Sequence, residues 1–225
     1  MKNKIIYLLL IAVFSVSITS CEEDLEIFDS NTLDYSGTFY YELYDDASEL
    51  QWPYIHAQSM MLYNTSANVA NEIWFENFDA GSLHIKSKFF LNGTSESFQS
   101  SSMNFADLPN NEAAIAAPST KPTGLGESVS VDREYIRNAI EAGNITVNGE
   151  TTVSGNPVDG IYIKFKMLSG TVNFTSYSIP VAERADPEVE QFDWLYESAT
   201  YDSTLDESWI FSGHRKTGFA VDDHH

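Results

Sequence analysis

Strict alternation of apolar and polar residues in two stretches restricts the fold more than any other feature of this sequence. In Ser82–Leu91 and Gly160–Leu168 large apolar residues recur at alternate positions, with Ser87 as the exception, and lysines stand between them. A period of two indicates strands with one buried face and one wet face, which is typical of antiparallel sheet. We therefore expect one face to be buried, with Leu83, Ile85, Phe89, Leu91, Ile161, Ile163, Phe165 and Met167, and the other to be exposed, with Lys86, Lys88, Lys164 and Lys166.

Shorter stretches of the same texture follow one another along the chain, separated by Gly, Asn, Asp and Ser. They predict further strands at Gly37–Tyr44, Ser59–Asn64, Asn71–Glu76, Ser97–Phe105, Ser128–Asp132, Asn144–Val147, Thr171–Ser176 and Ser208–Arg215. Many sequential antiparallel strands end as a sandwich or as a closed barrel, and closure leaves no exposed edge. We predict an all-β fold, an antiparallel barrel of about eight to ten strands.

Three segments interrupt this rhythm. Tyr135–Ala142 is compatible with a helical turn that Gly143 closes, and Ala106–Gly126 is predicted to be a long loop. The acidic segment Ile179–Glu207 is predicted to be an insertion with a short helix around Pro187–Leu195. No internal repeat and no second domain are evident in the sequence.

The first residues have the pattern of a bacterial lipoprotein signal. Two lysines precede an apolar run that is too short to span a bilayer, and Ile18-Thr19-Ser20-Cys21 resembles the lipobox that precedes an acylated cysteine. Cys21 is the only cysteine, which excludes disulfides. We predict a signal peptide over 1–20, lipid attachment at Cys21, an acidic tether over 21–34 and one barrel domain over 35–222.

The residues after Cys21 are Glu22, Glu23 and Asp24. This cluster resembles the signal that sends some Gram-negative lipoproteins to the cell surface, although a plain solvated tether explains it equally well. The expected location is therefore the outer membrane, on the cell surface, with the membrane as partner through the lipid anchor. The net charge of −21 argues against nucleic acid as a partner, because such binding needs basic patches.

Signals for catalysis or metal binding are weak. Gly126-Glu127-Ser128-Val129-Ser130 lacks the second glycine of a nucleophile elbow, and no two histidines have the His-Glu-x-x-His spacing. His84 and His214 lie on predicted strands, and Asp222-Asp223-His224-His225 is a candidate for weak metal binding. We predict no catalytic residue, no metal site and no cofactor.

Three motifs together resemble one family. The first includes Tyr63, Asn64 and Thr65, the second runs from Ser154 and Gly155 to Asp159, and the third includes Gly213, Arg215, Thr217, Gly218 and Phe219. They are similar to the Tyr-Asn-Thr-Ala, Ser-Gly-x-x-x-Asp and Gly-x-Arg-x-Thr-Gly-Phe signatures of the calycin-like lipid-binding putative hydrolases, which are Gram-negative lipoproteins. The resemblance covers roughly residues 35–222, with Ile179–Glu207 as a departure from the pattern.

The resemblance implies a calycin-like barrel whose last strand closes against the first. In such barrels an arginine of the last strand stacks on a tryptophan of the first; here Phe39 of Gly37-Thr38-Phe39 stands in that place. We therefore expect Arg215 to be largely buried, to contact Phe39 or Tyr41, and to donate to a backbone carbonyl, while Lys216 points the other way. The motif residues are expected to be structural.

Three functions remain open at this point. The leading one is binding of a small, partly apolar ligand inside the barrel, since a barrel of about eight strands has room for side chains or one ligand. The others are a hydrolase with an unidentified active site and a surface structural or interaction protein with a filled barrel. An open apolar cavity would favour the first, a histidine beside a carboxylate in a mouth the second, and a filled interior the third.

Overall fold

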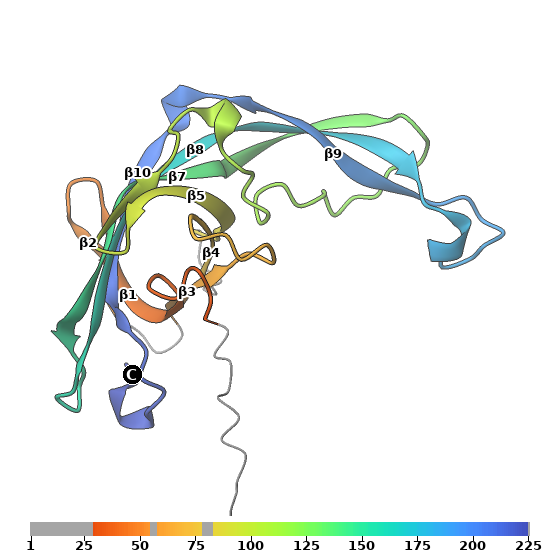
Figure 1. The fold of residues 1–225 in the computed structure, drawn as a ribbon. Coiled ribbons are helices and arrows are strands. Elements are labelled where there is room, and N and C mark those ends of the chain that lie inside the picture. Colours follow the sequence, from red (N-terminus) through yellow and green to blue (C-terminus); the bar gives the residue numbers. More distant parts are fainter. Residues whose placement is uncertain (1–28, 55–57, 78–82, 225) are drawn as a thin grey trace, which may run out of the picture.

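A computed structural model describes residues 29–54, 58–77 and 83–224 (Figure 1). The predicted signal peptide, Cys21 and the cluster Glu22–Asp24 lie outside the described residues. The strands are β1 (Gly37–Asp45), β2 (Leu50–Trp52), β3 (Ser59–Asn64), β4 (Glu72–Asn77), β5 (Lys86–Thr94), β6 (Ser97–Ser100), β7 (Ser128–Thr151), β8 (Pro157–Ser178), β9 (Phe192–Tyr201) and β10 (Glu207–Arg215). Short 3₁₀ turns stand at η1 (Phe105–Asp107), η2 (Val181–Glu183), η3 (Ser203–Leu205) and η4 (Ala220–Asp222), and the predicted all-β fold is confirmed.

Eight of these strands form a closed ring. Their order is β10-β1-β3-β4-β5-β6-β7-β8, and β8 pairs back with β10, so that the sheet closes on itself. All pairings in the ring are antiparallel, and the first and last strands meet as expected. The ring is the barrel that the alternating sequence predicts.

The middle of the barrel is filled by the protein's own aromatic side chains. The rings of Phe75, Phe165 and Phe211 make edge-to-face contacts, with centroids 4.8 to 5.6 Å apart. Phe89 packs against two of them, Tyr41 packs on Phe211, and all five rings have essentially no exposed surface. Interlocked rings of this kind give the dense packing of an ordinary protein core.

The predicted strand faces are confirmed. Leu83, Ile85, Phe89, Leu91, Ile161, Ile163, Phe165 and Met167 are all buried. The lysines lie on the outer face but are half-exposed rather than free, because carboxylates hold them: Lys88 pairs with Glu72 at 2.5 Å and Lys166 with Asp206 at 3.1 Å. Lysines on the outer surface of the barrel thus form ion pairs with carboxylates of neighbouring segments.

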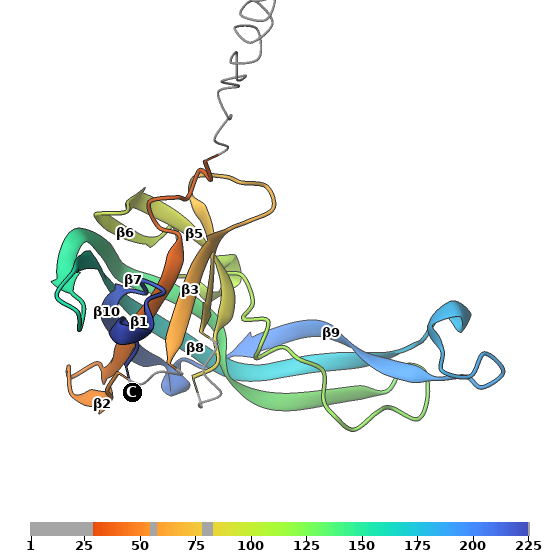
Figure 2. The same ribbon diagram turned by 90° about the horizontal axis from the view of Figure 1, so that it is seen from below.

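The two longest strands continue past the barrel and form an arm. We call the arm residues 128–133 of β7, residues 170–178 of β8, and β9; β8 pairs with β10 in the barrel and with β9 in the arm. Figures 1 and 2 both show β7, β8 and β9 extending away from the ring. The predicted helix around Pro187–Leu195 is wrong, because residues 192–195 begin β9, and Ile179–Glu207 contributes a strand rather than an interruption.

A bulge in β7 joins barrel and arm. Arg133 pairs with Gly170 and Arg137 with Leu168, so that three residues of β7 oppose the single residue Ser169 of β8. Such a bulge bends a strand and increases its twist. The helical turn predicted over Tyr135–Ala142 is therefore wrong: the break in alternation at this point marks a bulge within one continuous strand.

The predicted long loop is confirmed, and residues 101–127 cover one face of the arm. Phe105 and Ile115 of this loop pack against the inner residues of the arm, which include Val172 and Phe174. The indole nitrogen of Trp194 on β9 donates to the Thr120 carbonyl at 2.7 Å. The loop thus buries apolar residues that no strand of the barrel reaches.

Candidate functional site

Arg215 connects the first and last strands, β1 and β10, at the seam where they pair and close the barrel. It pairs with Phe39 in the sheet register, and its guanidinium carbon lies 4.8 Å from the centre of that ring. The guanidinium donates to the Ser36 carbonyl at 2.6 Å and to Asp159 at 3.0 Å. A Cβ on Gly37 would lie 2.0 Å from the guanidinium, so any larger residue there would displace Arg215 from this position.

The contacts predicted for Arg215 are confirmed, and its predicted burial is too high. The side chain is 30% exposed, because it lies at one end of the barrel rather than in its middle. Lys216 points to the other face as predicted, and its ammonium group lies 4.8 Å above the ring of Tyr40. Asp159, which the motif singled out without a role, is the partner that fixes Arg215.

The second and third motifs meet through Asp222. Its carboxylate accepts hydrogen bonds at 2.9 Å from the Ser154 amide and from the Thr217 hydroxyl. Hydrogen bonds from Ser154, with others from Thr217 and Thr152, hold the pKa of Asp222 at about 2. Sequence reasoning considered Asp222 only as part of a weak metal motif, because nothing in the sequence shows that residues 154 and 222 lie together.

Other motif residues shape turns and close contacts. Gly155 and Gly218 have positive φ values of 86° and 79°, which glycine adopts without strain. Gly213 lies so close to β1 that a Cβ would be 1.9 Å from the Tyr40 carbonyl. Phe219 is exposed.

The first motif ends β3 in a turn. Thr65 is buried and its carbonyl accepts from the Asn68 amide at 2.9 Å, while Asn64 is exposed. The Tyr63 ring stacks beside Trp74 on the outer face, and burial together with a hydrogen bond to Glu76 raises the pKa of Tyr63 to about 12. These contacts are those of a scaffold, as the sequence predicted for the motif residues.

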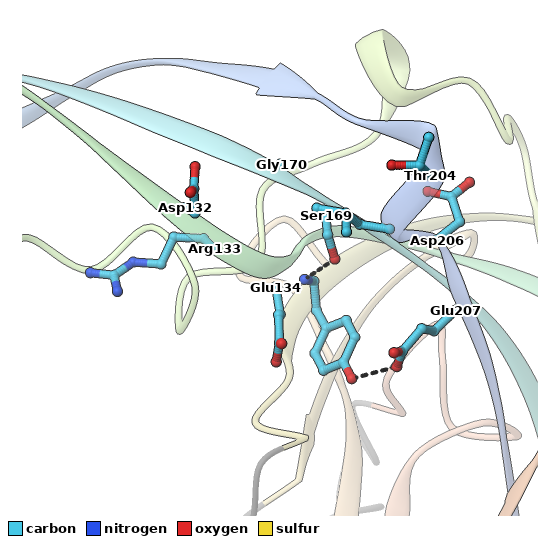
Figure 3. A pocket seen from close by; sticks show the side chains of 10 residues that line it. Asp132, Arg133, Glu134, Ser169, Gly170, Thr204, Asp206 and Glu207 are labelled. Atoms are coloured by element: carbon cyan, nitrogen blue, oxygen red, sulfur yellow. Dashed lines mark hydrogen bonds between the residues drawn. The ribbon is translucent and has the colours of Figure 1, made fainter.

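A surface cleft lies where the arm leaves the barrel (Figure 3). Its volume is about 550 Å³, within the usual range for small-molecule sites. Figure 3 shows Asp132 and Arg133 on one side and Thr204, Asp206 and Glu207 on the other. The remaining lining residues are Glu134, Tyr135, Ser169, Gly170 and Leu205.

Tyr135 stands at the back of this cleft in a strained conformation. Its φ of 56° is uncommon for a bulky residue, and such strain persists only where surrounding contacts enforce it. Here the Ser169 hydroxyl accepts from its amide at 2.9 Å, and Asn111 donates to its carbonyl at 3.0 Å. The phenol donates to Glu207 at 2.7 Å.

Carboxylates give the cleft its charge. Asp132, Glu134, Asp206 and Glu207 line it, Arg133 is the one cationic residue of the lining, and Lys166 pairs with Asp206 at 3.1 Å from beside it. Glu207 also accepts from the Trp209 indole at 3.0 Å, and Asp206 accepts from Tyr201 at 2.6 Å. Burial, followed by the hydrogen bond to Glu207, raises the pKa of the Tyr135 phenol well above its usual value, so it stays a donor.

Sequence reasoning missed this cleft. The signal was the phase of the alternation: Val129 and Val131 share one face of β7, whereas Tyr135 and Ile136 are both buried although they are adjacent. A change of phase within a strand indicates a bulge, and bulges often redirect side chains next to functional sites.

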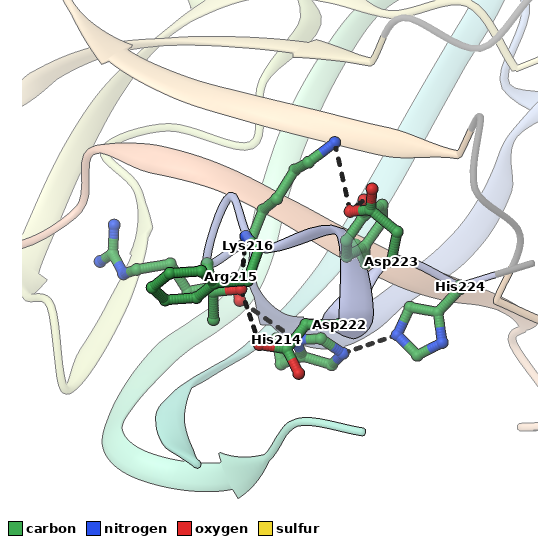
Figure 4. A network of polar contacts seen from close by, with 9 residues as sticks. His214, Arg215, Lys216, Asp222, Asp223 and His224 are labelled. Atoms are coloured by element: carbon green, nitrogen blue, oxygen red, sulfur yellow. Dashed lines mark hydrogen bonds and ion pairs between the residues drawn. The ribbon is translucent and has the colours of Figure 1, made fainter. Parts of the chain in front are cut away.

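A second polar cluster lies on the outer wall of the barrel, where the segment after β10 folds back (Figure 4). The Nε2 atoms of His214 and His224 are 2.8 Å apart. Tyr40 donates to Asp223 at 2.5 Å, and the ring of Tyr54 stacks on His224 with centroids 4.4 Å apart. His84, by contrast, is exposed just before β5 and has no such neighbours in the part of the chain that the structure describes.

Neither a three-ligand metal site nor a membrane-spanning helix is found among the described residues. No group of three or more His, Cys, Asp or Glu side chains is arranged to hold a metal ion. None of the helical turns described has the length and apolar character needed to cross a membrane.

An antiparallel ring of eight strands, closed by an arginine across the seam, defines an all-β, barrel-like protein of the calycin type. The sequence profile of the family described as lipid-binding putative hydrolase matches residues 24–220, and the chain belongs to this family. A search of the curated proteins gave no match.

Proposed function

We propose that this protein is a membrane-anchored lipoprotein that binds a small, partly apolar ligand in the cleft between barrel and arm, without transforming it. Membership of a lipid-binding family supports a ligand with an apolar part. The choice of the cleft as the binding site rests on one observation: residues around the cleft hold the backbone of Tyr135 in a strained conformation.

The barrel interior is a poorer place for the ligand than the sequence suggested. Phe75, Phe165 and Phe211 pack against one another across its middle and are fully buried. A ligand there would have to displace packed rings. Each displaced ring would lose packing energy of about several kcal/mol. A filled interior favours the third alternative, a structural or interaction protein, and it restricts ligand binding to a site on the outside of the barrel.

The lining of the cleft suits a ligand with two parts. Leu205 is 50% exposed at its edge and offers an apolar surface, beside the largely buried Tyr135. The excess of carboxylates favours a head group that carries an ammonium ion or several hydroxyls. A lipid-like amine or a glycosylated lipid has both features.

Binding without reaction fits the chemistry of the lining. None of the ten lining residues is His or Cys, and the Tyr135 phenol remains protonated at neutral pH. The Ser169 hydroxyl accepts from a backbone amide and makes no hydrogen bond to the carboxylates among these ten residues. The family description contains a hydrolase, but the cleft supplies no activated nucleophile of the Ser–His or Cys–His type.

Ligand binding is tested by native mass spectrometry of the protein purified from its own host, with Leu205→Asp as the variant. The charge in the apolar edge should remove a copurifying ligand. Leu195→Asp is the matched control, because Leu195 is similarly exposed, at 55%, but lies on the arm away from the cleft. Equal ligand occupancy in both variants would exclude the cleft as the binding site. A bound mass that is lost when Phe165 is replaced would place the ligand inside the barrel.

The anchor and the surface location belong to the same proposal and rest on the sequence. Cys21→Ser removes the thiol that accepts the lipid, and the protein should then leave the membrane fraction. Replacement of Glu22, Glu23 and Asp24 by Ala should keep the protein anchored but hide it from protease added to intact cells. A Ser variant that stays with membranes, or unchanged protease access after the triple replacement, would contradict these two parts separately.

A further inference from the structure

Two hollows on the outer wall of the barrel meet and form one groove. The larger, of about 580 Å³, lies between the β5–β6 hairpin and β7, and the smaller, of about 140 Å³, lies beside the end of β7. Asn144 and Tyr162 line both hollows, so the groove is continuous across these two side chains. None of its lining residues belongs to the cleft between barrel and arm, so the groove is a separate site.

The floor of the groove is a row of paired residues on three strands. Asn144 of β7 pairs with Tyr162 of β8, and Tyr162 pairs with Ser212 of β10. Both neighbours of Tyr162 in the chain, Ile161 and Ile163, are buried in the barrel core. Because side chains alternate along a strand, Tyr162 lies on the outer face, where it is half-exposed.

Irregular strand pairing shapes the groove on both sides of this row. On one side β7 has an extra residue, Glu141, that has no partner on β8, and on the other its pairing shifts again between Thr146 and Glu150. Such bulges redirect side chains and are common next to functional sites. The β5–β6 hairpin forms the remaining wall, and the Ile145 amide holds its turn in place by donating to the Ser95 carbonyl at 2.7 Å.

Several polar side chains of the groove have no partner in the part of the chain that the structure describes. Tyr44 and Tyr63, which also lie on the outside of the barrel, each donate to a carboxylate. The Tyr162 hydroxyl has no hydrogen bond to any described residue. The same holds for the exposed amides of Asn92 and Gln99, which lie opposite each other on β5 and β6. These groups are therefore available to a ligand.

The combination of groups suits a sugar. A sugar ring has C–H groups on its faces, which pack against the electron-rich face of an aromatic ring. Its hydroxyls both donate and accept, so they need partners that do the same. The Tyr162 ring provides the aromatic surface, and the amides of Asn92 and Gln99 provide donors and acceptors.

The charge of the lining restricts the kind of sugar. Glu96, Glu141 and Glu150 line the groove, and no lysine or arginine is among the lining residues. Lys164 stands beside the groove and pairs with Glu141 at 3.4 Å, but it also pairs with Asp46 at 2.7 Å. The excess negative charge disfavours uronic acids and sulfated sugars, because like charges repel across an interface.

We propose that this groove binds a short neutral oligosaccharide, with one sugar ring packed on Tyr162 and its hydroxyls bonded to Asn92 and Gln99. Two joined hollows suit several sugar units in a chain better than a single unit. The site is independent of the cleft between barrel and arm, so the two can hold different ligands at the same time.

The test is a glycan array, followed by calorimetric titration of the full chain in a detergent without a sugar head group. We expect a neutral oligosaccharide to bind and oligogalacturonate not to bind. Tyr162→Ala should weaken binding at least about tenfold, whereas Tyr162→Phe keeps the ring and should keep most of the affinity. Tyr177→Ala is the matched control, because Tyr177 is on the same strand and 38% exposed but lies on the arm, and it should bind as the unchanged protein does.

A second variant keeps the test valid if Tyr162→Ala disturbs the fold, which thermal unfolding would show. Gln99 is exposed, and Gln99→Ala removes one amide without touching the core, so it should weaken binding about threefold to tenfold.

Three results would overturn the proposal. The first is the absence of binding to every neutral glycan on the array. The second is an unchanged affinity in both Tyr162→Ala and Gln99→Ala, which would place the sugar elsewhere. The third is a loss of binding in Leu205→Asp but not in Tyr162→Ala, which would place the sugar in the cleft between barrel and arm.

Discussion

The barrel and the arm are built from the same two strands, yet they bury their apolar faces in different ways. In the barrel, β7 and β8 have neighbours on both sides, and their inner residues meet those of the opposite strands. In the arm only β9 joins them, and the loop over residues 101–127 supplies the cover. The outer face of the arm is polar and tied by side chains, with Asn173 bonded to Ser130 at 2.7 Å and to Ser198 at 3.1 Å.

In a closed ring the opposite wall of the barrel covers the apolar face of each strand. An open sheet needs another part of the chain to cover that face. This accounts for the length of the loop, which would otherwise be unusual in a compact domain. It also accounts for the difference in burial: the barrel core is a large set of fully buried side chains. Among the described residues, the apolar cluster of the arm has Val172 and Phe174 as buried members, together with Ile136 at the bulge and partly buried neighbours. The arm should therefore open more easily than the barrel.

The largest expected effect comes from paired core truncations. Phe165→Ala in the barrel should lower the free energy of unfolding by about 3–5 kcal/mol, because it leaves a cavity among interlocked rings. Phe174→Ala in the arm should cost less, since its partners are half-exposed and can close around the gap. Denaturant unfolding measures the loss of unfolding free energy, and hydrogen exchange shows which residues open more often.

Exchange should rise throughout the chain for the barrel variant and only in residues 128–133, 171–178 and 192–201 for the arm variant. Equal global losses from both substitutions would show that barrel and arm unfold as one unit.

Two glycines allow the same comparison at strand contacts. A Cβ on Gly213 would lie 1.9 Å from the Tyr40 carbonyl, and a Cβ on Gly170 would lie 2.0 Å from the Thr200 carbonyl. Gly213→Ala should separate β1 from β10 and cost about 1–3 kcal/mol or more, because both neighbours are backbone. Gly170→Ala should separate β9 from β8 at the base of the arm and leave the barrel transition nearly unchanged.

Gly155→Ala is the control for these two glycines, since its Cβ would meet nothing within 4 Å. Only the positive φ is then unfavourable, at about 1 kcal/mol. Thermal unfolding of all three variants, with exchange of the β9 amides, separates the contributions. A greater global loss for Gly170→Ala than for Gly213→Ala would reverse the proposed order of stability.

A smaller loss of stability is expected from Arg215→Lys, which tests the seam between β1 and β10. Lysine keeps the charge but loses the planar stack on Phe39 and the pair of hydrogen bonds to Ser36 and Asp159, so we expect a loss of about 1–2 kcal/mol. Lys216→Ala removes a half-exposed neighbour on the other face and should change stability little. A lysine variant as stable as the original protein would mean that the backbone pairing alone closes the barrel.

How much of this could be predicted from the sequence depends on the range of the interactions. Alternation fixed the faces of Gly160–Leu168 and Ser82–Leu91, because a period of two is a local property. The Arg215–Phe39 contact could also be predicted, through the resemblance that pairs the last strand with the first. In both cases the sequence contains the required pattern within a few residues.

The arm and the cleft could not be predicted in this way. Tyr135–Ala142 and Pro187–Leu195 were expected to be helical because their alternation is broken or weak. Only pairing with β8 makes the first segment, and the second from Phe192 onward, part of strands. The cleft combines residues 132–135, 169–170 and 204–207, which come together because the bulge in β7 and the turn between β9 and β10 meet beside Gly170. No local sequence pattern indicates that these three segments lie together in the fold.

The smallest expected effect concerns pH and compares one carboxylate of the barrel with one of the arm. Asp222 joins the β7–β8 hairpin to the segment after β10, and its pKa of about 2 lies below the value of about 3.9 in an unfolded chain. A lowered pKa contributes stability that is complete above the unfolded value and is lost as pH falls through the folded one. Asp222→Asn should therefore flatten the fall in unfolding free energy between about pH 4 and pH 2.

Asp193 is the counterpart in the arm. The Lys121 ammonium, followed by the Trp194 amide, lowers the pKa of Asp193, and this ion pair fastens the loop to β9 at 2.6 Å. Its contribution too is present above the unfolded pKa and disappears on acidification, but it acts on the loop rather than on the whole fold. Asp193→Asn should therefore leave the unfolding curve almost unchanged at neutral pH while speeding protease cleavage within residues 116–127. Cleavage that is equally slow in the variant would mean that the Trp194 indole bond to Thr120 holds the loop without the ion pair, and Trp194→Phe, which removes that donor, would then be the substitution that releases it.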